Sequence, residues 1–461
     1  MSDMRRIPVS VWSAGVLLIA AAGVVRYAYS GVYWAAINHT WWGLREQLGP
    51  LWEFVRDGTR YVGIDPPSGL IVFKDGPIFH LVAYVLEVAT PSDRALELSF
   101  LVIAHACVLS AFYLLDRTLF SSSRWQVRVL FWGVALNFTP VLYNLGIKNL
   151  ESWELLCMAI ALNLMLHQRP AMRRLAGVPL VLAGLTKVYA GFLLLYLVFR
   201  NRVAVMIAAA VAAVTLTFSH WFFGADIGWG YPGRMLTAGF GERSWGGFYW
   251  ENNSLKGLLN KALIRFELPN ETHYFTHLVE PEAAVVVDRV VLVVSLALIG
   301  FSMLMLWRWK PSPRLDPLRT LSGFASAAAL MFVIAPLLSY DTLTMAVPVY
   351  AILLHLAERG LVSRGARIAT LVSLVLVGNV MPNSVLVWLL GIDGLNATFN
   401  IAPHLSPTEV YKFLGFPGMG AMLLLGAMVA VQWRLVRLDR VPEPEGHALV
   451  GHPADATPAR T

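Results

Sequence analysis

Long apolar segments recur along nearly the whole chain, and they constrain its fold more than any other feature. Of the 461 residues, 57% are hydrophobic and 14% are charged, whereas soluble domains carry about 25% charged residues. A helix of about 20 apolar residues crosses a bilayer. The composition therefore excludes an ordinary soluble enzyme and a disordered chain, and it predicts an all-α polytopic membrane protein.

We expect about 10 full spans, some of them tilted or short. The predicted spans are residues 8–28, 96–116, 127–145, 150–167, 203–222, 284–307, 319–339, 343–358, 366–391 and 411–434. Residues 76–90 are too short for a span and contain Glu87, so we predict a re-entrant or interfacial helix. Residues 175–199 have arginines beyond both ends, which predicts a re-entrant hairpin that enters and leaves on one side.

Arginines and lysines gather near alternate span ends, and this asymmetry predicts the orientation. With both termini cytoplasmic, every inner connection is rich in arginine. Residues 29–95 and 223–283 are then outer loops, within one transmembrane domain over residues 1–440. Residues 441–461 have no apolar period and are predicted to be a disordered cytoplasmic tail. We expect localisation to a bacterial inner (plasma) membrane.

Charge and cysteine content exclude other classes of protein. The net charge is +7, but no basic and aromatic patch predicts a nucleic-acid partner. Cys107 and Cys157 both lie in apolar runs, so no disulfide framework is expected. Neither CxxC nor HExxH spacing occurs in the sequence. We therefore expect no metal and no cofactor.

The first outer loop carries the clearest cluster of acids, which are Glu46, Glu53, Asp57, Asp65 and Asp75. Glu53 and Asp57 are four residues apart and would share one face of a helix. A carboxylate at a lipid–water boundary can serve as a general base. The same acids would equally form a solvated face that pairs with nearby arginines.

Two lysines lie where a charge is costly unless it meets a partner or a watery cavity. Lys148 follows the third predicted span, where it would line a site or simply snorkel from a turn. Lys187 lies at the predicted tip of the hairpin, near mid-membrane. It would either pair with an acid or meet a lipid phosphate.

The second outer loop is dense in groups that hydrogen-bond and stack. Arg243 offers a planar fork for phosphate, and Trp245 suits a sugar ring. Asn252, Asn253 and Ser254 would bind a sugar or cap the helix that follows. Beyond the span 319–339, Tyr340 and Asp341 are candidates for the same site, although Asp341 would also suit a helix cap.

The order of these segments resembles glycosyltransferase family 87, the polyprenyl-phosphate-mannose-dependent mannosyltransferases of the GT-C membrane superfamily. The family's Asn-Gln-Ser-Leu-x-Gly segment is similar to residues 252–257, and its Gly-Gln-x-Asn segment is similar to residues 146–149. Its glycine- and lysine-bearing hairpin is similar to residues 176–187, and its Pro-x-Ser-Trp-x-His ending is similar to residues 336–342. The resemblance extends over about residues 40–360.

The resemblance implies a GT-C-like bundle and a polyprenyl-phosphate sugar donor, with a lipid-linked or cell-envelope glycan as acceptor. The family's first-loop aspartate aligns near Gly49 or Pro50, which are not acids. Either another acid, Asp57, Glu53, Glu46 or Asp75, takes the role of base, or the activity is altered.

We therefore expect an inverting glycosyltransferase. Its candidate site residues fall into three sets. The candidate catalytic acids are Asp57, Glu53 and Asp75, the candidate donor-phosphate ligands are Arg243, Lys148 and Lys187, and the candidate sugar or acceptor ligands are Trp245, Asn252, Asn253, Ser254, Tyr340 and Asp341. The alternatives are a secondary transporter or lipid flippase, which long outer loops and the lack of a visible repeat disfavour, and an inactive relative that binds glycan lipids.

Overall fold

In a computed structural model, the chain is helical throughout the part that can be described. The structure describes residues 9–37, 76–90, 92–225, 227–233, 252–263, 281–310, 312–313, 315–335, 338–378, 411–412 and 414–440. No strand occurs within these ranges. The all-α prediction is confirmed for them, and the predicted tail at residues 441–461 lies outside them.

Six of the described helices are long and apolar enough to cross a membrane. They match six of the predicted spans. The first is a continuous helix made of α1 (Val9–Arg26), η2 (Tyr27–Trp34) and α2 (Ala35–Ile37), and the others are α5 (Asp93–Leu119), α12 (Arg202–Phe223), α15 (Pro281–Arg308), α16 (Asp316–Ile334) and α22 (Phe416–Asp439).

The other four predicted spans are interrupted, short or only partly described, so the count of 10 is not confirmed. The segment 127–145 is bent by 42° between α6 (Trp125–Leu136) and α7 (Thr139–Ile147). A seventh span results if this pair counts as one. Proline lacks an amide hydrogen and interrupts helices, and Pro140 lies at the start of α7.

Three shorter helices complete this account. They are α8 (Glu151–Leu166), α17 (Val347–Glu358), which follows the 3₁₀ helix η4 (Asp341–Ala346), and α18 (Arg364–Gly378). Most side chains of α8, η4 and α17 are buried. A helix surrounded by protein does not need the full bilayer length, which explains why apolar content alone does not establish α8 and α17 as spans.

The segment predicted as a hairpin does turn back on itself. After α9 (Pro170–Arg174), the chain forms α10 (Gly177–Gly184), the 3₁₀ turn η3 (Val188–Gly191) and α11 (Phe192–Arg200). Asn201 Nδ2 donates to the Arg173 carbonyl at 2.9 Å, so the two ends of the segment meet. A Cβ on Gly184 would lie 3.0 Å from the Cα of Gly191, so glycine permits the close return. The predicted reversal of the chain is confirmed, and entry and exit on one side of a membrane stay a prediction.

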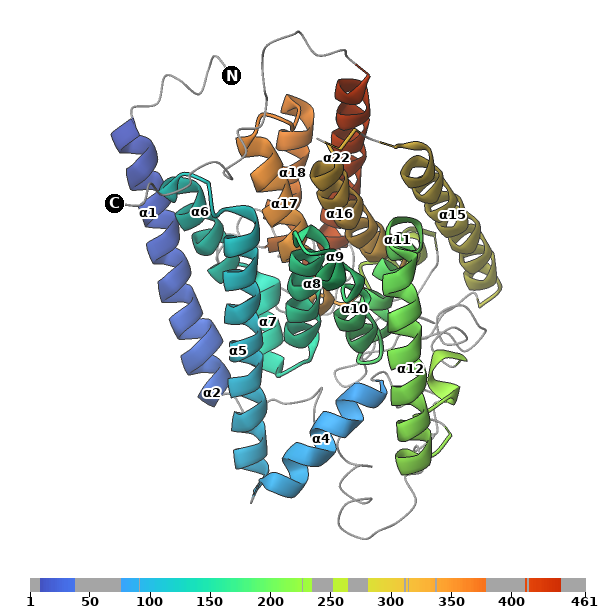
Figure 1. The fold of residues 1–461 in the computed structure, drawn as a ribbon. Helices are drawn as coiled ribbons and strands as arrows, with labels where there is room; N and C mark the ends of the chain where they lie inside the picture. Colours follow the sequence, from blue (N-terminus) through green and yellow to red (C-terminus); the bar gives the residue numbers. More distant parts are fainter. Residues whose placement is uncertain are drawn as a thin grey trace, which may run out of the picture.

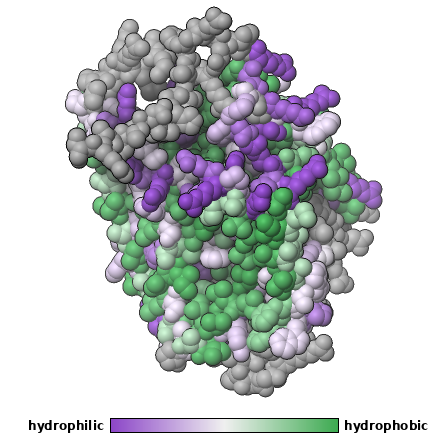
Figure 2. Space-filling model, in the orientation of Figure 1, coloured by the Kyte–Doolittle hydropathy of each residue, from purple (hydrophilic) through white to green (hydrophobic). Residues whose placement is uncertain are grey.

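The arginine-rich connections share one end of the molecule. Ser123 Oγ donates to Glu358 at 2.6 Å, and the Ser312 amide donates to Asp439 at 3.1 Å. Arg200, at the end of α11, pairs with Asp316 at the start of α16. Figure 2 shows hydrophilic residues gathered above a broad apolar surface. Arginines therefore border an apolar belt of the kind that faces lipid.

The opposite ends of the helices carry a different set of elements. In Figure 1, α4 (Pro77–Ala89) lies obliquely beneath the bundle, between the lower parts of α5 and α12. The Gly76 amide, just before α4, donates to the Thr186 carbonyl at 2.6 Å. The part of the first outer loop that begins at Gly76 is thus attached to the tip of the hairpin.

Candidate active site

The turn between α7 and α8 forms one wall of a buried polar cluster. The Asn149 amide donates to the Asn144 carbonyl at 3.1 Å, and the Lys148 amide donates to the Leu145 carbonyl at 3.3 Å. This is the Schellman pattern of a helix end, which places Lys148 in the left-handed region at φ 57°. Glycine usually occupies that position, so the lysine is held there at a conformational cost.

An ion pair accounts for how Lys148 is held. Its Nζ lies 2.7 Å from Glu97 Oε1 of α5, and its side chain is fully buried. Arg94, one turn earlier on α5, lies 2.5 Å from the other oxygen of Glu97. A buried charge is tolerated when it is paired. Glu97 thus joins the start of α5 to the turn after α7.

The hairpin tip supplies the second part of the cluster. Lys187 Nζ lies 2.5 Å from Glu151 Oε1 and donates to Asn149 Oδ1 at 3.0 Å. Asn149 Nδ2 donates to Asp341 Oδ2 at 2.5 Å, and Asn144 Nδ2 donates to Glu151 Oε2 at 2.6 Å. Lys187 therefore lies within a network that contains two carboxylates. The alternative in which Lys187 pairs with an acid is confirmed.

A third segment meets this network through residues 338–342. Asn252 Oδ1 accepts hydrogen bonds from the amides of Leu338 and Ser254, both at 3.0 Å. The Asn253 amide donates to the Leu338 carbonyl at 2.9 Å. Ser254 Oγ accepts from the Gly257 amide at 3.2 Å and so caps α14 (Leu255–Leu263). Capping is confirmed for Ser254, while Asn252 fixes the chain that leads to Asp341.

Four segments that are far apart in sequence therefore converge. They are the turn at 146–151, the hairpin tip at 186–187, residues 252–257 and residues 338–342. The charged groups of the network, Arg94, Lys148, Lys187, Glu97, Glu151 and Asp341, carry three positive and three negative formal charges. In surroundings of low polarity each interaction between charges is stronger than in water. A charge added to the cluster would therefore interact strongly with these groups.

The candidate residues separate into two groups. The first group belongs to the converging segments and consists of Lys148, Lys187, Asn252, Asn253, Ser254, Tyr340 and Asp341. Tyr340 is fully buried and donates to the Val377 carbonyl at 3.1 Å, which anchors η4 to α18. The acids Asp57, Glu53 and Asp75, together with Arg243 and Trp245, lie outside the described residues.

Sequence reasoning missed Glu97, Arg94 and Asn144. Glu97 lies at the start of the predicted span 96–116. An ionisable residue within an apolar run usually has a partner inside the bundle, and Arg94 with Glu97 shows the spacing of one helical turn. That signal could have identified both. The sequence contains no comparable signal for Asn144.

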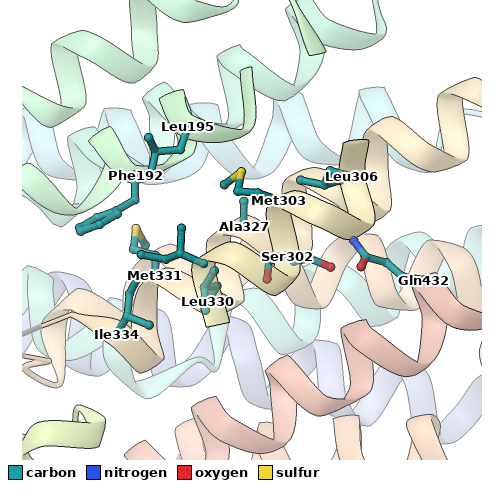
Figure 3. Close-up of a pocket in the computed structure, with 12 residues that line it drawn as sticks. Phe192, Leu195, Ser302, Met303, Leu306, Ala327, Leu330, Met331, Ile334 and Gln432 are labelled. Atoms are coloured by element: carbon teal, nitrogen blue, oxygen red, sulfur yellow. The ribbon is translucent and has the colours of Figure 1, made fainter. Parts of the chain in front are cut away.

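No metal centre is found at this cluster within the described residues. There, no group of three or more His, Cys, Asp or Glu side chains could hold a metal ion. Figure 3 shows an apolar crevice elsewhere, in which Phe192, Met303 and Leu330 come from α11, α15 and α16. Its volume of about 20 Å³ has room for one water-sized group, so the crevice cannot hold a polyprenyl chain as it stands.

This fold and site define a class of protein: a helical membrane bundle with a buried charged cluster between its helix ends. Within that class, the chain belongs to glycosyltransferase family 87, whose sequence profile matches residues 73–339. The match includes the first three converging segments and the start of the fourth. The protein is therefore a membrane glycosyltransferase, and the transporter or flippase alternative is disfavoured.

Comparison with other proteins adds one structure. The crystal structure of ArnT from Cupriavidus metallidurans in the apo state is similar at a TM-score of 0.38 and 17% sequence identity. The similarity covers 91% of this chain and 78% of that chain. Among curated proteins, none matches the chain.

Proposed function

We propose that the protein transfers a hexose, mannose, from a polyprenyl-phosphate donor to a lipid-linked or cell-envelope glycan acceptor. The reaction takes place on the outer face of a bacterial inner membrane, at the end of the bundle that contains the cluster around Lys187. The observation that carries this proposal is the convergence of segments 146–151, 186–187, 252–257 and 338–342 on one buried network. Those are the segments that resemble the family's motifs.

A lipid-phosphate donor suits the charge and depth of this network. Lys187 keeps 9% of its side chain exposed, whereas Lys148 keeps none. Of these two lysines, Lys187 is therefore the better placed to meet an incoming phosphate. An ammonium fixed in advance stabilises negative charge on a leaving phosphate without reorganisation. Lys148, bound to Glu97, acts through the turn that carries Asn149, and Arg243 is a further candidate phosphate ligand.

The transfer itself is a single displacement with inversion. The acceptor hydroxyl oxygen bonds to the anomeric carbon while the bond from that carbon to the phosphate oxygen breaks. A carboxylate takes the hydroxyl proton, and polyprenyl phosphate leaves with the electron pair. No metal is needed for this balance.

The base comes from the first outer loop, where Asp57, Glu53 and Asp75 are the candidates. Asp75 is bonded to Gly76, whose amide donates to Thr186 next to Lys187. Consecutive Cα atoms are about 3.8 Å apart, which favours Asp75 among the three. Trp245, Asn252, Asn253, Ser254, Tyr340 and Asp341 are the candidates for positioning the sugar and the acceptor.

The test is a transfer assay on purified protein in nanodiscs, with radiolabelled polyprenyl-phosphate-mannose and extracted envelope lipids. We expect Lys187→Met and Asp75→Asn each to lower kcat/KM at least about 100-fold, in line with loss of one stabilising or acid–base group. Lys310→Met changes an exposed lysine at the arginine-rich end and should leave transfer unchanged. Full activity in Asp75→Asn would move the role of base to Asp57 or Glu53, and donor binding without turnover in the wild type would identify an inactive relative.

A further inference from the structure

The arginine-rich end of the molecule contains a cavity that the transfer reaction does not use. Its volume is about 360 Å³. The polar residues that line it are Arg173, Arg174, Arg200, Asn201, Asp316 and Thr320. Leu166, at the far end of α8 from Glu151, also lines it. The 16 residues of α8 rise about 24 Å, so this cavity is well separated from the cluster around Lys187.

Part of the wall is fixed by internal contacts. Arg200 pairs with Asp316 and donates to Thr320 Oγ1 at 2.9 Å. Asn201 Nδ2 holds the Arg173 carbonyl at 2.9 Å, which ties α9 to the start of α12. The cavity is therefore bounded by the short helix α9, which contacts Asn201, and by the end of α11, which contacts the start of α16.

The remaining charge in the cavity is uncompensated. Three arginines and one aspartate line it, which leaves a formal charge of +2. Arg173 and Arg174 have exposed side chains, and across the described part of the chain neither guanidinium forms an ion pair. Guanidinium groups bind phosphate oxygens through paired hydrogen bonds. The chemistry of the cavity thus fits a phosphate group.

Adjacent apolar surface indicates that the phosphate belongs to a lipid. Val198 and Phe199, directly before Arg200, are 39% and 43% exposed. Val203 and Met206 of α12 are 45% and 71% exposed. A ligand with its phosphate among the arginines would have its acyl chains beside these side chains. Anionic lipids are attracted to basic segments at the membrane surface.

We propose that the cavity lined by Arg173, Arg174 and Arg200 binds the phosphate of an anionic membrane lipid, in the leaflet opposite the transfer site. The lipid bridges α9, α11 and α16 at the base of the hairpin that carries Lys187 at its tip.

The test measures the thermal unfolding midpoint of the detergent-solubilised protein as short-chain phosphatidylglycerol is added. A ligand that binds the folded state raises the midpoint with concentration. In Arg173→Gln/Arg174→Gln the concentration needed for a given rise should increase at least about tenfold, because two charged hydrogen-bond donors are removed. The matched control is Arg359→Gln/Arg364→Gln, which removes the same charge at exposed positions outside the cavity and should change that concentration less than about twofold.

Two further arms decide between sources of the phosphate. Inorganic phosphate at the same concentration should give no comparable rise; an equal rise would assign the cavity to a free anion and overturn the lipid. Equal weakening in both double variants would reveal general attraction to a basic surface and would also overturn the proposal. If the double variant does not fold, Arg174→Gln alone should still weaken the response about threefold, and an unchanged response would count against the cavity.

Discussion

Lys148 shows how a single residue connects backbone strain to the site. It is the only residue other than glycine with a positive φ in the described part of the chain. A left-handed conformation costs a residue with a Cβ about 1–2 kcal/mol. The ion pair with Glu97 stabilises that conformation. The resulting turn places Asn149 within hydrogen-bonding distance of both Lys187 and Asp341.

Removing the Lys148 ammonium should therefore destabilise the protein. We expect Lys148→Met to lower the free energy of unfolding by about 3 kcal/mol, the lower end for breaking a buried pair, because Arg94 still neutralises Glu97. Denaturation in mixed detergent micelles measures this change. In Lys148→Met/Glu97→Gln part of the loss should be recovered, since the buried carboxylate that had lost one of its two cationic partners is then neutral. A loss in the double variant equal to the sum of the losses in Lys148→Met and Glu97→Gln would show that the pair is not coupled.

At the scale of elements, the hairpin and α4 show what the sequence could and could not predict. Basic residues beyond both ends of 175–199 predicted the hairpin because a single crossing would place like charges on opposite sides. The short length of the apolar segment 76–90 and its Glu87 predicted a re-entrant or interfacial helix. Nothing in either pattern indicated that Gly76 would bond to Thr186, since contacts between segments 110 residues apart leave no local signal.

The close approach of Gly76 to the hairpin gives an element-level prediction. A Cβ at Gly76 would lie 1.9 Å from the Leu185 carbonyl oxygen, so α4 would have to move away from the hairpin tip. We expect Gly76→Ala to cost about 1–3 kcal/mol of stability and to reduce transfer, measured by thermal unfolding and by the nanodisc assay.

The control for that variant is Gly300→Ala in α15. A Cβ there meets nothing within 4 Å, and alanine favours a helix more than glycine does. Gly300→Ala should therefore match or slightly exceed the wild type in both measurements. If Gly76→Ala is as stable and active as Gly300→Ala, the attachment of α4 does not position the site.

At the scale of the whole molecule, apolar length predicted the membrane class, while the count of 10 spans is not confirmed by the described residues. Of the described helices, those that face lipid over much of their length, such as α15, were found by hydropathy alone. Helices such as α8 are just as apolar but are surrounded by protein. Hydropathy does not distinguish a side chain buried in lipid from one buried in protein. For the same reason, the motifs identified the site segments but not Glu97 and Arg94, which join them.

The orientation of the bundle is a prediction that the native cysteines make easy to test. Cys107 and Cys157 are buried, so a cysteine placed on the surface should react with a membrane-impermeant thiol reagent well before they do. Gln168 is exposed at the arginine-rich end, and Ala89 is exposed at the end of α4. Because arginine-rich connections remain in the cytoplasm, Ala89→Cys should be labelled in cells whose inner membrane is intact, and Gln168→Cys only after that membrane is permeabilised. The reverse pattern would place the Lys187 cluster on the cytoplasmic side, where an outer-leaflet donor could not reach it, and would require a donor from the inner leaflet instead.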